Sequence, residues 1–452
     1  MKSPAKSTTA VPTVSIIIPV YNQVGYLISC IRSIRKSINA TTYEIVVVDD
    51  QSSVESSDEI DRIEGIRLIR NYSNLGFLRT CNRGALNSQG KYLYFLNSDT
   101  EITDYCLDEL VGVFERFPEA GLVGSKLVYP DGTLQECGGI VWQDGSAWNY
   151  GRNDDPNKPE YNYTKEVDYV SGAAILIRKS DFLDIGLFDS RYTPAYYEDT
   201  DLAFKVRVAG MQTFVEPRSV VIHHEGKSCG TDTCTGAKHY QIINGQKFYD
   251  KWESRLSQSH FPNAVNVEKA RDRSASKKSI LVIDHYIPTF DRDAGSRCIY
   301  MYLNAMVDIG LHVTFYPDNF YQDPVYTEYL EKIGIEVLYG NHYYHNHEQW
   351  LEDNLGRFDY IFLSRPHISI KRIEAVKTHC RGKIIYFGHD IHHLRLSRES
   401  EQLGKDLSAE IEEQKESKHV FSHFNGPWQT QCWSCGPLTT RWKSCASTTR
   451  AR

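Results

Sequence analysis

No run of 18 apolar residues occurs anywhere in the chain, and the polar N-terminal stretch MKSPAKSTTAVPT is not followed by an apolar segment. A membrane-spanning helix needs about 20 apolar residues, and a signal peptide needs an apolar central region. We therefore expect that the chain neither spans a membrane nor enters one by itself.

The chain also lacks an excess of basic residues and a close, even spacing of cysteines. Its formal net charge is −7, which gives no general attraction to nucleic acid. The eleven Cys are spread singly, unlike the disulfide framework of a small secreted protein. These features predict a reduced, intracellular protein without a nucleic-acid partner, and 452 residues are enough for two or three domains.

Short apolar runs alternate with helical patterns in the first part of the chain. Residues 14–20 and 44–50 are near-continuously apolar and β-branched, as in strands buried on both faces of a parallel sheet. Between them, Leu27, Ile31 and Ile34 form one apolar stripe of a helix. The alternation continues through residue 96 and predicts a doubly wound α/β domain.

Glycine-rich phosphate-binding motifs are missing from this domain. No GxGxxG follows Val20, and no GxxxxGK[ST] occurs in the chain. Instead, Asp50 and Asp99 follow the ends of two predicted strands, where open parallel sheets bind ligands. Because carboxylates repel phosphate unless a divalent cation lies between them, a phosphate-containing ligand here implies a metal ion.

Seven motifs in a fixed order now carry a family resemblance, in which residues 14–252 resemble a family 2 inverting glycosyltransferase with the GT-A fold. The motifs are IIIPVYN (16–22), VVDDQS (47–52), NLGFLRTCNRG (74–84), LNSDT (96–100), VSGAAILIRK (170–179), GLFDSRYTPAYYEDTDLAFKVRVAG (186–210) and VVIHHEGKS (220–228).

The resemblance implies a binding site for a nucleotide sugar at the strand ends. Pro19, Tyr21 and Asp50 would hold the nucleoside, with the Asp50 carboxylate accepting from the N3–H of uracil or thymine. The other residues implied to contact the nucleotide sugar are Asn22, Asn74, Gly76, Asn97 and Ser98. The alternatives are structural: a helix cap or turn acid for Asp50, and an ordinary turn at 74–76.

A metal site is implied by the segment LNSDT, which stands where the family has Asp-x-Asp. Asp99 would bind Mg²⁺ or Mn²⁺, while Asn97 replaces the first acid and can ligate only through its neutral oxygen or through water. His223 resembles the family's late histidine ligand, and the adjacent His224 is an alternative. Asp99 could otherwise cap the helix that begins near Tyr105.

Two adjacent acids, Glu198 and Asp199, begin an amphipathic helix that stops at Gly210. The helix dipole alone favours acids in this position. They also align with the family's Glu-Asp signature, which implies that Asp199 is the general base that takes the proton of the acceptor hydroxyl. Glu198 would contact sugar hydroxyls.

The implied function is transfer of a sugar from a UDP- or dTDP-sugar, with rhamnose as one family possibility, to a hydroxyl of a cell-surface polysaccharide or a lipid-linked glycan. The aromatics of the loop 136–168 either stack on sugars or cover the core: Trp142, Trp148, Tyr150, Tyr161 and Tyr163. The implied location is cytoplasmic, and peripheral association with the inner face of the plasma membrane through the acceptor stays open.

Two other functions are alternatives. A sugar nucleotidyltransferase would need a basic, glycine-rich first loop, which PVYNQ is not. A noncatalytic protein that binds nucleotide sugars or glycans would not need Asp99, Glu198 and Asp199 together.

The remainder of the chain divides by composition. Residues 1–13 are predicted to be disordered, 253–278 to form a linker, and 279–398 to form a second Rossmann-like domain. That domain resembles the N-terminal half of family 4, GT-B glycosyltransferases, without the second half that mainly binds the donor. It would bind an acceptor or represent a truncated second transferase. Residues 399–452, which include CWSC (432–435), are expected to be helical or irregular and partly disordered.

Overall fold

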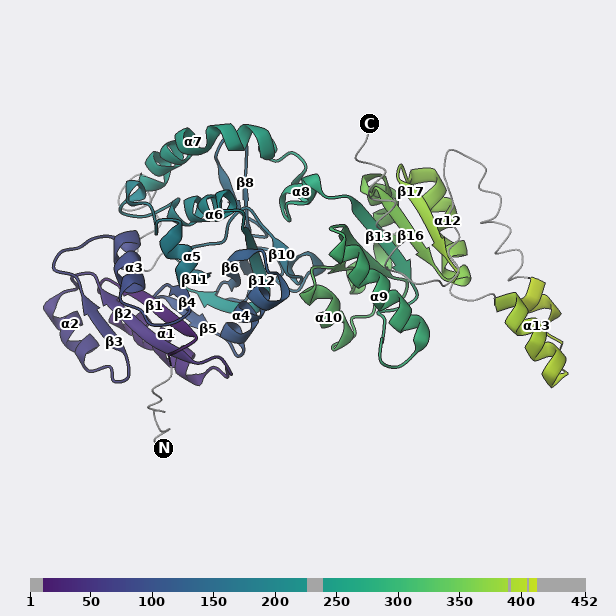
Figure 1. Cartoon of the computed structure of the whole chain (residues 1–452), viewed down its shortest axis with the longest axis horizontal. Helices are drawn as coiled ribbons and strands as arrows, with labels where there is room; N and C mark the ends of the chain where they lie inside the picture. Colours follow the sequence, from purple (N-terminus) through teal and green to yellow (C-terminus); the bar gives the residue numbers. More distant parts are fainter. Residues whose placement is uncertain (1–10, 226–238, 389–391, 405, 413–452) are drawn as a thin grey trace. The chain divides into compact units, whose positions relative to one another are not determined.

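The computed structural model describes residues 11–225, 239–388, 392–404 and 406–412, and the chain divides into two compact units (Figure 1). Unit 1 comprises residues 1–276 and 332–334, and unit 2 comprises residues 277–331 and 335–452. Within the described stretches, no helix is long and apolar enough to cross a membrane.

Unit 1 is built on a ten-stranded sheet with helices on both faces. The strands of this sheet are β1 Val14–Val20, β2 Tyr43–Asp49, β3 Arg67–Arg70, β4 Tyr92–Leu96, β5 Thr100–Ile102, β6 Ala120–Val128, β7 Leu134–Glu136, β10 Lys165–Glu166, β11 Ala174–Arg178 and β12 Gln212–His223. A separate hairpin pairs β8 Gly139–Val141 with β9 Ala147–Asn149. The helices are α1 Val24–Lys36, α2 Val54–Asp61, α3 Phe77–Leu86, α4 Cys106–Arg116, α5 Lys179–Asp184, α6 Glu198–Val208, α7 His239–Ser259 and α8 Val267–Ala270.

The main path of the sheet has the order β10-β12-β6-β11-β4-β1-β2-β3. Strands β1 to β4 are parallel, as the apolar runs predicted. The sheet as a whole is mixed, because β11 lies antiparallel between β4 and β6. The predicted α/β class is therefore confirmed, and the antiparallel part is a feature that the apolar runs did not predict.

Each face of the sheet has its own apolar core. On one face α1 and α4 cover β1, β4 and β6 through residues such as Leu27, Ile31 and Leu110, which are fully or almost fully buried. On the other face α3, α5, α6 and α7 pack together, and Phe248 of α7 meets Phe204 of α6 with ring centroids 4.9 Å apart. The start of α6 in this second layer lines the same cavity as Asn97 and Asp99, which follow β4.

The predicted linker at 253–278 is wrong, because these residues fold onto unit 1. Helix α7 continues to Ser259, and Ala270 of α8 packs against Ile140 and Trp142. Arg273 forms an ion pair with the buried Asp168. Many of the contacts that hold this segment are charged or polar. A solvated linker and a packed polar segment can therefore have the same amino-acid composition.

Unit 2 contains a five-stranded sheet of order β15-β14-β13-β16-β17 in which every pairing is parallel. Its strands are β13 Ser279–Asp284, β14 His312–Pro317, β15 Glu336–Val337, β16 Tyr360–Ser364 and β17 Lys383–Phe387. Its helices are α9 Ala294–Asp308, α10 Tyr326–Lys332, α11 Asn341–Asn354, α12 Pro366–His379 and α13 His392–Leu403. The second α/β region is present, while its relation to GT-B enzymes stays a prediction. Residues 1–10 and 413–452, which include CWSC, lie outside the described residues.

Candidate functional site

A cavity of about 710 Å³ in unit 1 brings together five of the residues predicted from the sequence. Its lining includes Asn97, Asp99, Glu198, Asp199 and His223. They come from the end of β4, the start of α6 and the end of β12, which together span more than 120 positions of the chain. The acids and the histidine predicted to act together therefore do lie around one space.

One side of the cavity has the chemistry of a cation site. His223 Nε2 lies 3.4 Å from Asp99 Oδ1, and both side chains are buried. His223 Nδ1 lies 3.1 Å from Gln135 Oε1. Because an amide oxygen can only accept, Nδ1 donates to Gln135, and in the neutral imidazole the lone pair of Nε2 then faces Asp99. A partner on the second ring nitrogen is the usual way in which proteins orient a metal-binding histidine.

Asn97 and His224 have different surroundings in the structure. Asn97 Oδ1 is buried and has no hydrogen-bond partner among the described residues, so it is available to a ligand or ion. His224 turns elsewhere, with Nε2 3.2 Å from Glu101 Oε1. His224 is not a lining residue of the cavity, whereas His223 is.

The start of α6 also contributes to the lining of the cavity. Tyr196 and Tyr197, just before the helix, both have left-handed backbones, with φ values of 74° and 70°. The fully buried amide of Asn244 in α7 holds this turn by donating to the carbonyls of Tyr192 at 2.7 Å, Ala195 at 2.8 Å and Tyr196 at 3.2 Å. A backbone conformation that is costly for tyrosine is thus fixed where it directs the two acids into the cavity.

The two acids have different surroundings. Asp199 Oδ2 accepts from the Gly172 amide at 2.9 Å, and Oδ1 accepts from the amide and hydroxyl of Thr200. Burial raises the pKa of Asp199, and these hydrogen bonds act against that rise. Glu198 Oε2 is buried without a hydrogen-bond partner in the described part of the chain, and burial together with the charge of Asp199 raises the pKa of Glu198 well above its usual value.

Asp201, the third acid of the same motif, has a structural role. It is fully buried, and its Oδ1 accepts from the Tyr192 hydroxyl at 3.1 Å and from Trp252 Nε1 at 2.8 Å. The Lys251 ammonium lies 2.7 Å from the same oxygen. Asp201 therefore joins α6 to α7 and does not line the cavity.

Asp50 lies at the end of β2, where its carboxylate organises the loop after β3. Oδ1 accepts from Asn71 Nδ2 at 2.7 Å and from the Leu75 amide at 2.8 Å, and Oδ2 accepts from the Gly76 amide at 2.9 Å. About four lone-pair sites exist on a carboxylate, so these bonds leave room for one further donor. The nucleoside-binding role of Asp50 stays a prediction.

The loop at 74–76 adjoins the cavity without lining it. Gly76 has φ +79°, and a Cβ there would lie 3.1 Å from atoms of Pro194. Their chain neighbours Phe77 and Ala195 both line the cavity. The close approach of the Gly76 and Pro194 backbones thus connects the strand-end region with the acids.

The remaining residues predicted to bind the nucleotide sugar lie outside the cavity lining: Pro19, Tyr21, Asn22, Asn74 and Ser98. Asn22 joins two loops, since its backbone amide donates to Ser52 Oγ at 2.8 Å and its side-chain Oδ1 accepts from the backbone amide of Ser53 at 2.8 Å. The Tyr21 side chain is exposed at the end of β1, which leaves its ring accessible to a base.

Glu136 is a cavity residue that the sequence analysis did not predict. It is 1% exposed, its Oε1 accepts from the Ser171 amide at 2.9 Å, and it lines the same cavity as Glu198 and Asp199. Strand β7 is three residues long, which is too short for an alternating pattern to be recognised.

The aromatic residues of the loop 136–168 divide into core and cavity residues. Trp142, Tyr161 and Tyr163 are buried, so they cover the core. Trp148 is 40% exposed and lines the cavity, and its ring lies edge-on to Trp142 with centroids 4.9 Å apart. Trp148 is the member of this group whose placement suits stacking on a sugar.

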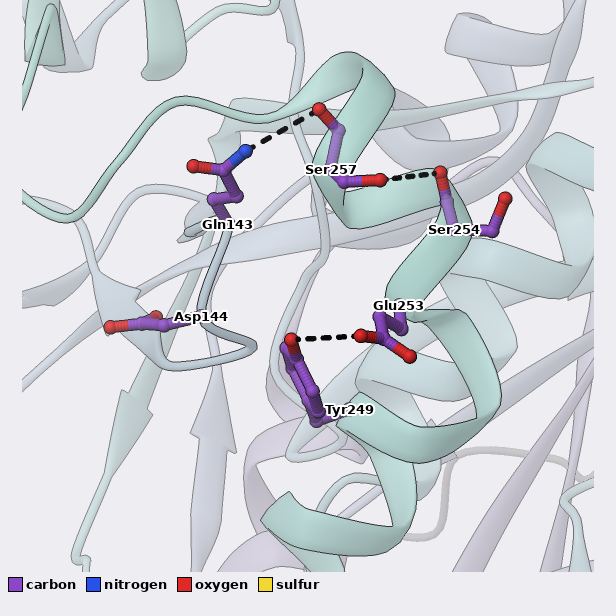
Figure 2. Close-up of a pocket in the computed structure, with 6 residues that line it drawn as sticks. All are labelled: Gln143, Asp144, Tyr249, Glu253, Ser254 and Ser257. Carbon is purple, nitrogen blue, oxygen red and sulfur yellow. Dashed lines mark hydrogen bonds between the residues drawn. The ribbon is translucent and has the colours of Figure 1, made fainter.

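A second cavity of about 530 Å³ lies between the turn of the β8–β9 hairpin and α7 (Figure 2). Its polar groups are largely engaged with one another: Gln143 Nε2 donates to the Ser257 carbonyl, and the Tyr249 hydroxyl donates to Glu253 Oε1 at 3.3 Å. None of the residues predicted from the sequence lines it. The acid-lined cavity is therefore the candidate active site.

The fold and this cavity define unit 1 as a ligand-binding unit of the doubly wound α/β class. Residues 15–182 match the family model described as Glycosyl transferase family 2. This match lies within unit 1, and the predicted GT-A-like fold is confirmed.

Similar proteins align over part of their length. The chain is 28% identical over 243 residues to the O-antigen biosynthesis protein RfbC of Myxococcus xanthus, covering 51% of this chain and 18% of that protein. It is 26% identical over 215 residues to the N-acetylglucosaminyl-diphospho-decaprenol L-rhamnosyltransferase of Mycobacterium tuberculosis, covering 41% and 68%. The crystal structure of GalNAc-T7 with UDP, GalNAc and Mn²⁺ aligns at 17% identity with a TM-score of 0.44, covering 55% and 50%. The chain thus spans less than a fifth of the first of these relatives.

Proposed function

We propose that unit 1 is an inverting glycosyltransferase that transfers a sugar from a UDP- or dTDP-sugar to a hydroxyl of a polysaccharide or lipid-linked glycan. The observation that carries this proposal is the single cavity that is lined by Asp99, His223, Glu198 and Asp199. The match of residues 15–182 to a glycosyl transferase family supports the reaction class.

The proposal includes a divalent cation, Mg²⁺ or Mn²⁺, held by Asp99 and His223 with the neutral oxygen of Asn97 beside them. The separation of 3.4 Å between Asp99 Oδ1 and His223 Nε2 suits two adjacent ligands of one octahedral ion, which stand roughly 3 Å apart. No group of three or more His, Cys, Asp or Glu is arranged for a metal among the described residues. Hard cations that bind nucleotides take their other ligands from water and phosphates, so these residues fit. When bound, the ion would neutralise the departing diphosphate.

Asp199 is proposed to act as the general base. The oxygen of the acceptor hydroxyl forms a bond to the anomeric carbon, the bond from that carbon to the diphosphate breaks, and the nucleoside diphosphate leaves with the electron pair. The acceptor proton passes to Asp199, whose orientation is fixed by Gly172 and Thr200. Burial strengthens it as a base by raising its pKa, because a base works best when its pKa approaches the working pH.

The nucleoside is proposed to lie at the ends of β1 and β2, against Tyr21 and the loop that Asp50 holds. This region adjoins the cavity through Gly76 and Pro194. The acceptor would enter from the side of Trp148, whose exposed ring can stack on a sugar. The names of the two bacterial relatives support an acceptor in cell-surface glycan synthesis and make dTDP-rhamnose a donor to test. A cytoplasmic location with peripheral attachment through a lipid-linked acceptor belongs to the same proposal.

The test is nucleotide release by the full chain over UDP-, dTDP- and GDP-sugars, with Mn²⁺ or EDTA. We expect one donor to be hydrolysed slowly without an acceptor, and we expect EDTA to abolish this release. Asp199→Asn should reduce transfer by about 10²- to 10⁴-fold. Asp58→Asn, an exposed acid on α2, is the matched control and should retain wild-type activity.

The outcomes separate the possible functions. Binding of a nucleotide sugar by calorimetry, without turnover for any acceptor offered, would favour a noncatalytic binding protein. Release of pyrophosphate from a nucleoside triphosphate and a sugar phosphate would instead favour a nucleotidyltransferase. Failure to bind any nucleotide sugar would refute the proposal.

A further inference from the structure

We propose that Glu136 is a ligand-binding residue that donates a hydrogen bond from a protonated Oε2 to a neutral hydroxyl of the acceptor sugar. This inference rests on the proposed glycosyltransferase function and specifies how the acceptor is recognised. It assigns to Glu136 a role different from that of Asp199, although both are carboxyl groups in one cavity.

The position of Glu136 carries the first step. The residue ends β7, is 1% exposed and lines the cavity. Its Oε1 accepts from the Ser171 amide, whereas its Oε2 is buried without a hydrogen-bond partner within the described ranges. A buried polar atom left without a partner is costly, so such an atom beside a cavity indicates a partner supplied by a ligand.

Glu136 and Asp199 are fixed by consecutive peptide units. The Ser171 amide donates to Glu136 Oε1 at 2.9 Å, and the next amide, that of Gly172, donates to Asp199 Oδ2 at 2.9 Å. A ligand whose attacking hydroxyl meets Asp199 therefore brings neighbouring groups within reach of Glu136. We assign these neighbouring groups to the acceptor sugar, because Asp199 is the base that contacts the acceptor.

Glu136 and Glu198 are buried and Asp199 is half-buried. These three carboxyl groups cannot all be charged in one cavity, because like charges in a poorly solvated space repel strongly. Asp199 accepts three hydrogen bonds, Glu136 accepts one, and Glu198 Oε2 accepts none from the described residues. Hydrogen bonds from amides favour the charged form of a carboxyl. The negative charge is therefore best held at Asp199, and Glu136 retains its proton.

The groups around Glu136 agree with this assignment. Burial is the main cause that raises the pKa of Glu136 to about 8, and the negative charge of Asp199 adds to this rise. The Ser171 amide and the Arg152 guanidinium act to lower the pKa. Glu225 adds to the rise, and the Tyr169 hydroxyl also faces this acid. At pH 7 Glu136 is then mostly the neutral acid.

A neutral carboxylic acid selects the kind of ligand group that it can bind. It donates one hydrogen bond and accepts weakly, which suits a sugar hydroxyl. A metal ion or a ligand ammonium group would require the charged form. Glu136 is thus proposed to donate a hydrogen bond to a sugar hydroxyl next to the attacking one.

The test compares Glu136→Gln with Glu136→Ala, because glutamine keeps the shape and can still donate. The probe is a panel of methyl glycosides and their monodeoxy analogues, with the donor that the wild type hydrolyses. We expect Glu136→Gln to retain transfer within about threefold. We also expect transfer by the wild type to decline above pH 8, where Glu136 loses its proton, and transfer by Glu136→Gln not to show this decline. Glu136→Ala should raise the acceptor KM about tenfold, as expected for one lost hydrogen bond, with donor hydrolysis unchanged.

Several results would overturn the proposal. If Glu136→Gln loses as much transfer as Asp199→Asn, a charged carboxylate is needed at this position. If Glu136→Ala binds acceptors normally, Glu136 does not contact the acceptor. Glu115→Gln, an exposed acid on α4, is the control for the substitution itself. One deoxy analogue should be bound equally by the wild type and by Glu136→Ala, and this identifies the hydroxyl.

A measurement without turnover keeps the two proposals distinguishable. The infrared spectrum of the wild type minus that of Glu136→Gln at pH 7 should contain the carbonyl band of one protonated carboxylic acid, beyond any band from Glu198 that both proteins share. The spectrum of the wild type minus that of Glu115→Gln should lack this band. Absence of this band would refute the protonated form even if the transferase is active. Its presence in a protein that turns over no donor would support the protonated acid while the transferase proposal fails.

Discussion

His223 Nε2 faces Asp99 Oδ1 across 3.4 Å, and the other ring nitrogen of His223 donates to Gln135 Oε1 at 3.1 Å. Gln135 therefore sets which nitrogen carries the proton and how the ring is turned. Because Gln135 and Glu136 are adjacent on β7, one short strand supports both the proposed cation site and the proposed acceptor site.

Replacing Gln135 with Leu should weaken metal binding without removing a ligand. We expect the Mn²⁺ concentration for half-maximal nucleotide release to rise about 10- to 100-fold, the usual effect of losing the partner of a metal-binding histidine. Loss of the electron paramagnetic resonance signal of free Mn²⁺ on addition of the protein measures metal binding without turnover. Gln143→Leu changes the same residue type in the other cavity and should leave both values unchanged.

Replacing Asn244 with Leu should release the turn that precedes α6. One buried and two half-buried residues lose the donor to their carbonyls, so the free energy of unfolding should fall by roughly 1 to 3 kcal/mol. Sugar transfer should fall at least tenfold, since small displacements of catalytic groups are costly. Denaturant unfolding and initial rates measure the two effects, and Gln258→Leu on α7 is the control. Full activity in a destabilised variant would contradict the link between turn and acids.

Local patterns drew attention to the acids, whereas His223 was predicted only through the family resemblance. Asp99 follows a continuous apolar strand, and Glu198 and Asp199 begin a helix. Their meeting depends on long-range pairing that no local pattern contains. His223 reaches Asp99 because β12 pairs antiparallel with β5, with His223 opposite Thr100.

The residues that sequence reasoning missed are those with only long-range contacts. Gln135 and Glu136 lie on a three-residue strand, and Asn244 resembles any polar residue of a helix until its carbonyl partners are known. The segment 253–278 was misread as a linker because its contacts with unit 1, such as that of Arg273 with Asp168, are polar. Polar composition alone does not distinguish a solvated segment from one held by buried ion pairs.

Replacing Asp201 with Asn separates the third acid of EDTD from the first two. Removing the buried negative charge leaves the Lys251 ammonium paired only with Asp189, at 3.0 Å, so the cost in stability should be smaller than the about 3 to 5 kcal/mol typical of an uncompensated buried charge. We expect a lower thermal midpoint and a much smaller loss of transfer than in Asp199→Asn, measured well below the midpoint. Asp250→Asn, on the exposed side of α7, is the matched control. Equal losses of transfer in Asp201→Asn and Asp199→Asn would contradict the structural role.

Glu136 should also make stability depend on pH in the absence of any ligand. Its pKa is about 8 in the folded protein and 4.5 for an ordinary glutamate, so between these values the folded state holds a proton that the unfolded state has released. Stability contributed by this group is therefore complete below about pH 4.5 and decreases as the pH rises, by up to ~1.4 kcal/mol per pH unit, until about pH 8. Glutamine at this position does not titrate, so Glu136→Gln should gain stability relative to the wild type between pH 5 and pH 8. Denaturant unfolding of both proteins at several pH values measures this difference, and Glu115→Gln should show none. A difference that stays constant with pH would mean that Glu136 is charged in the folded protein.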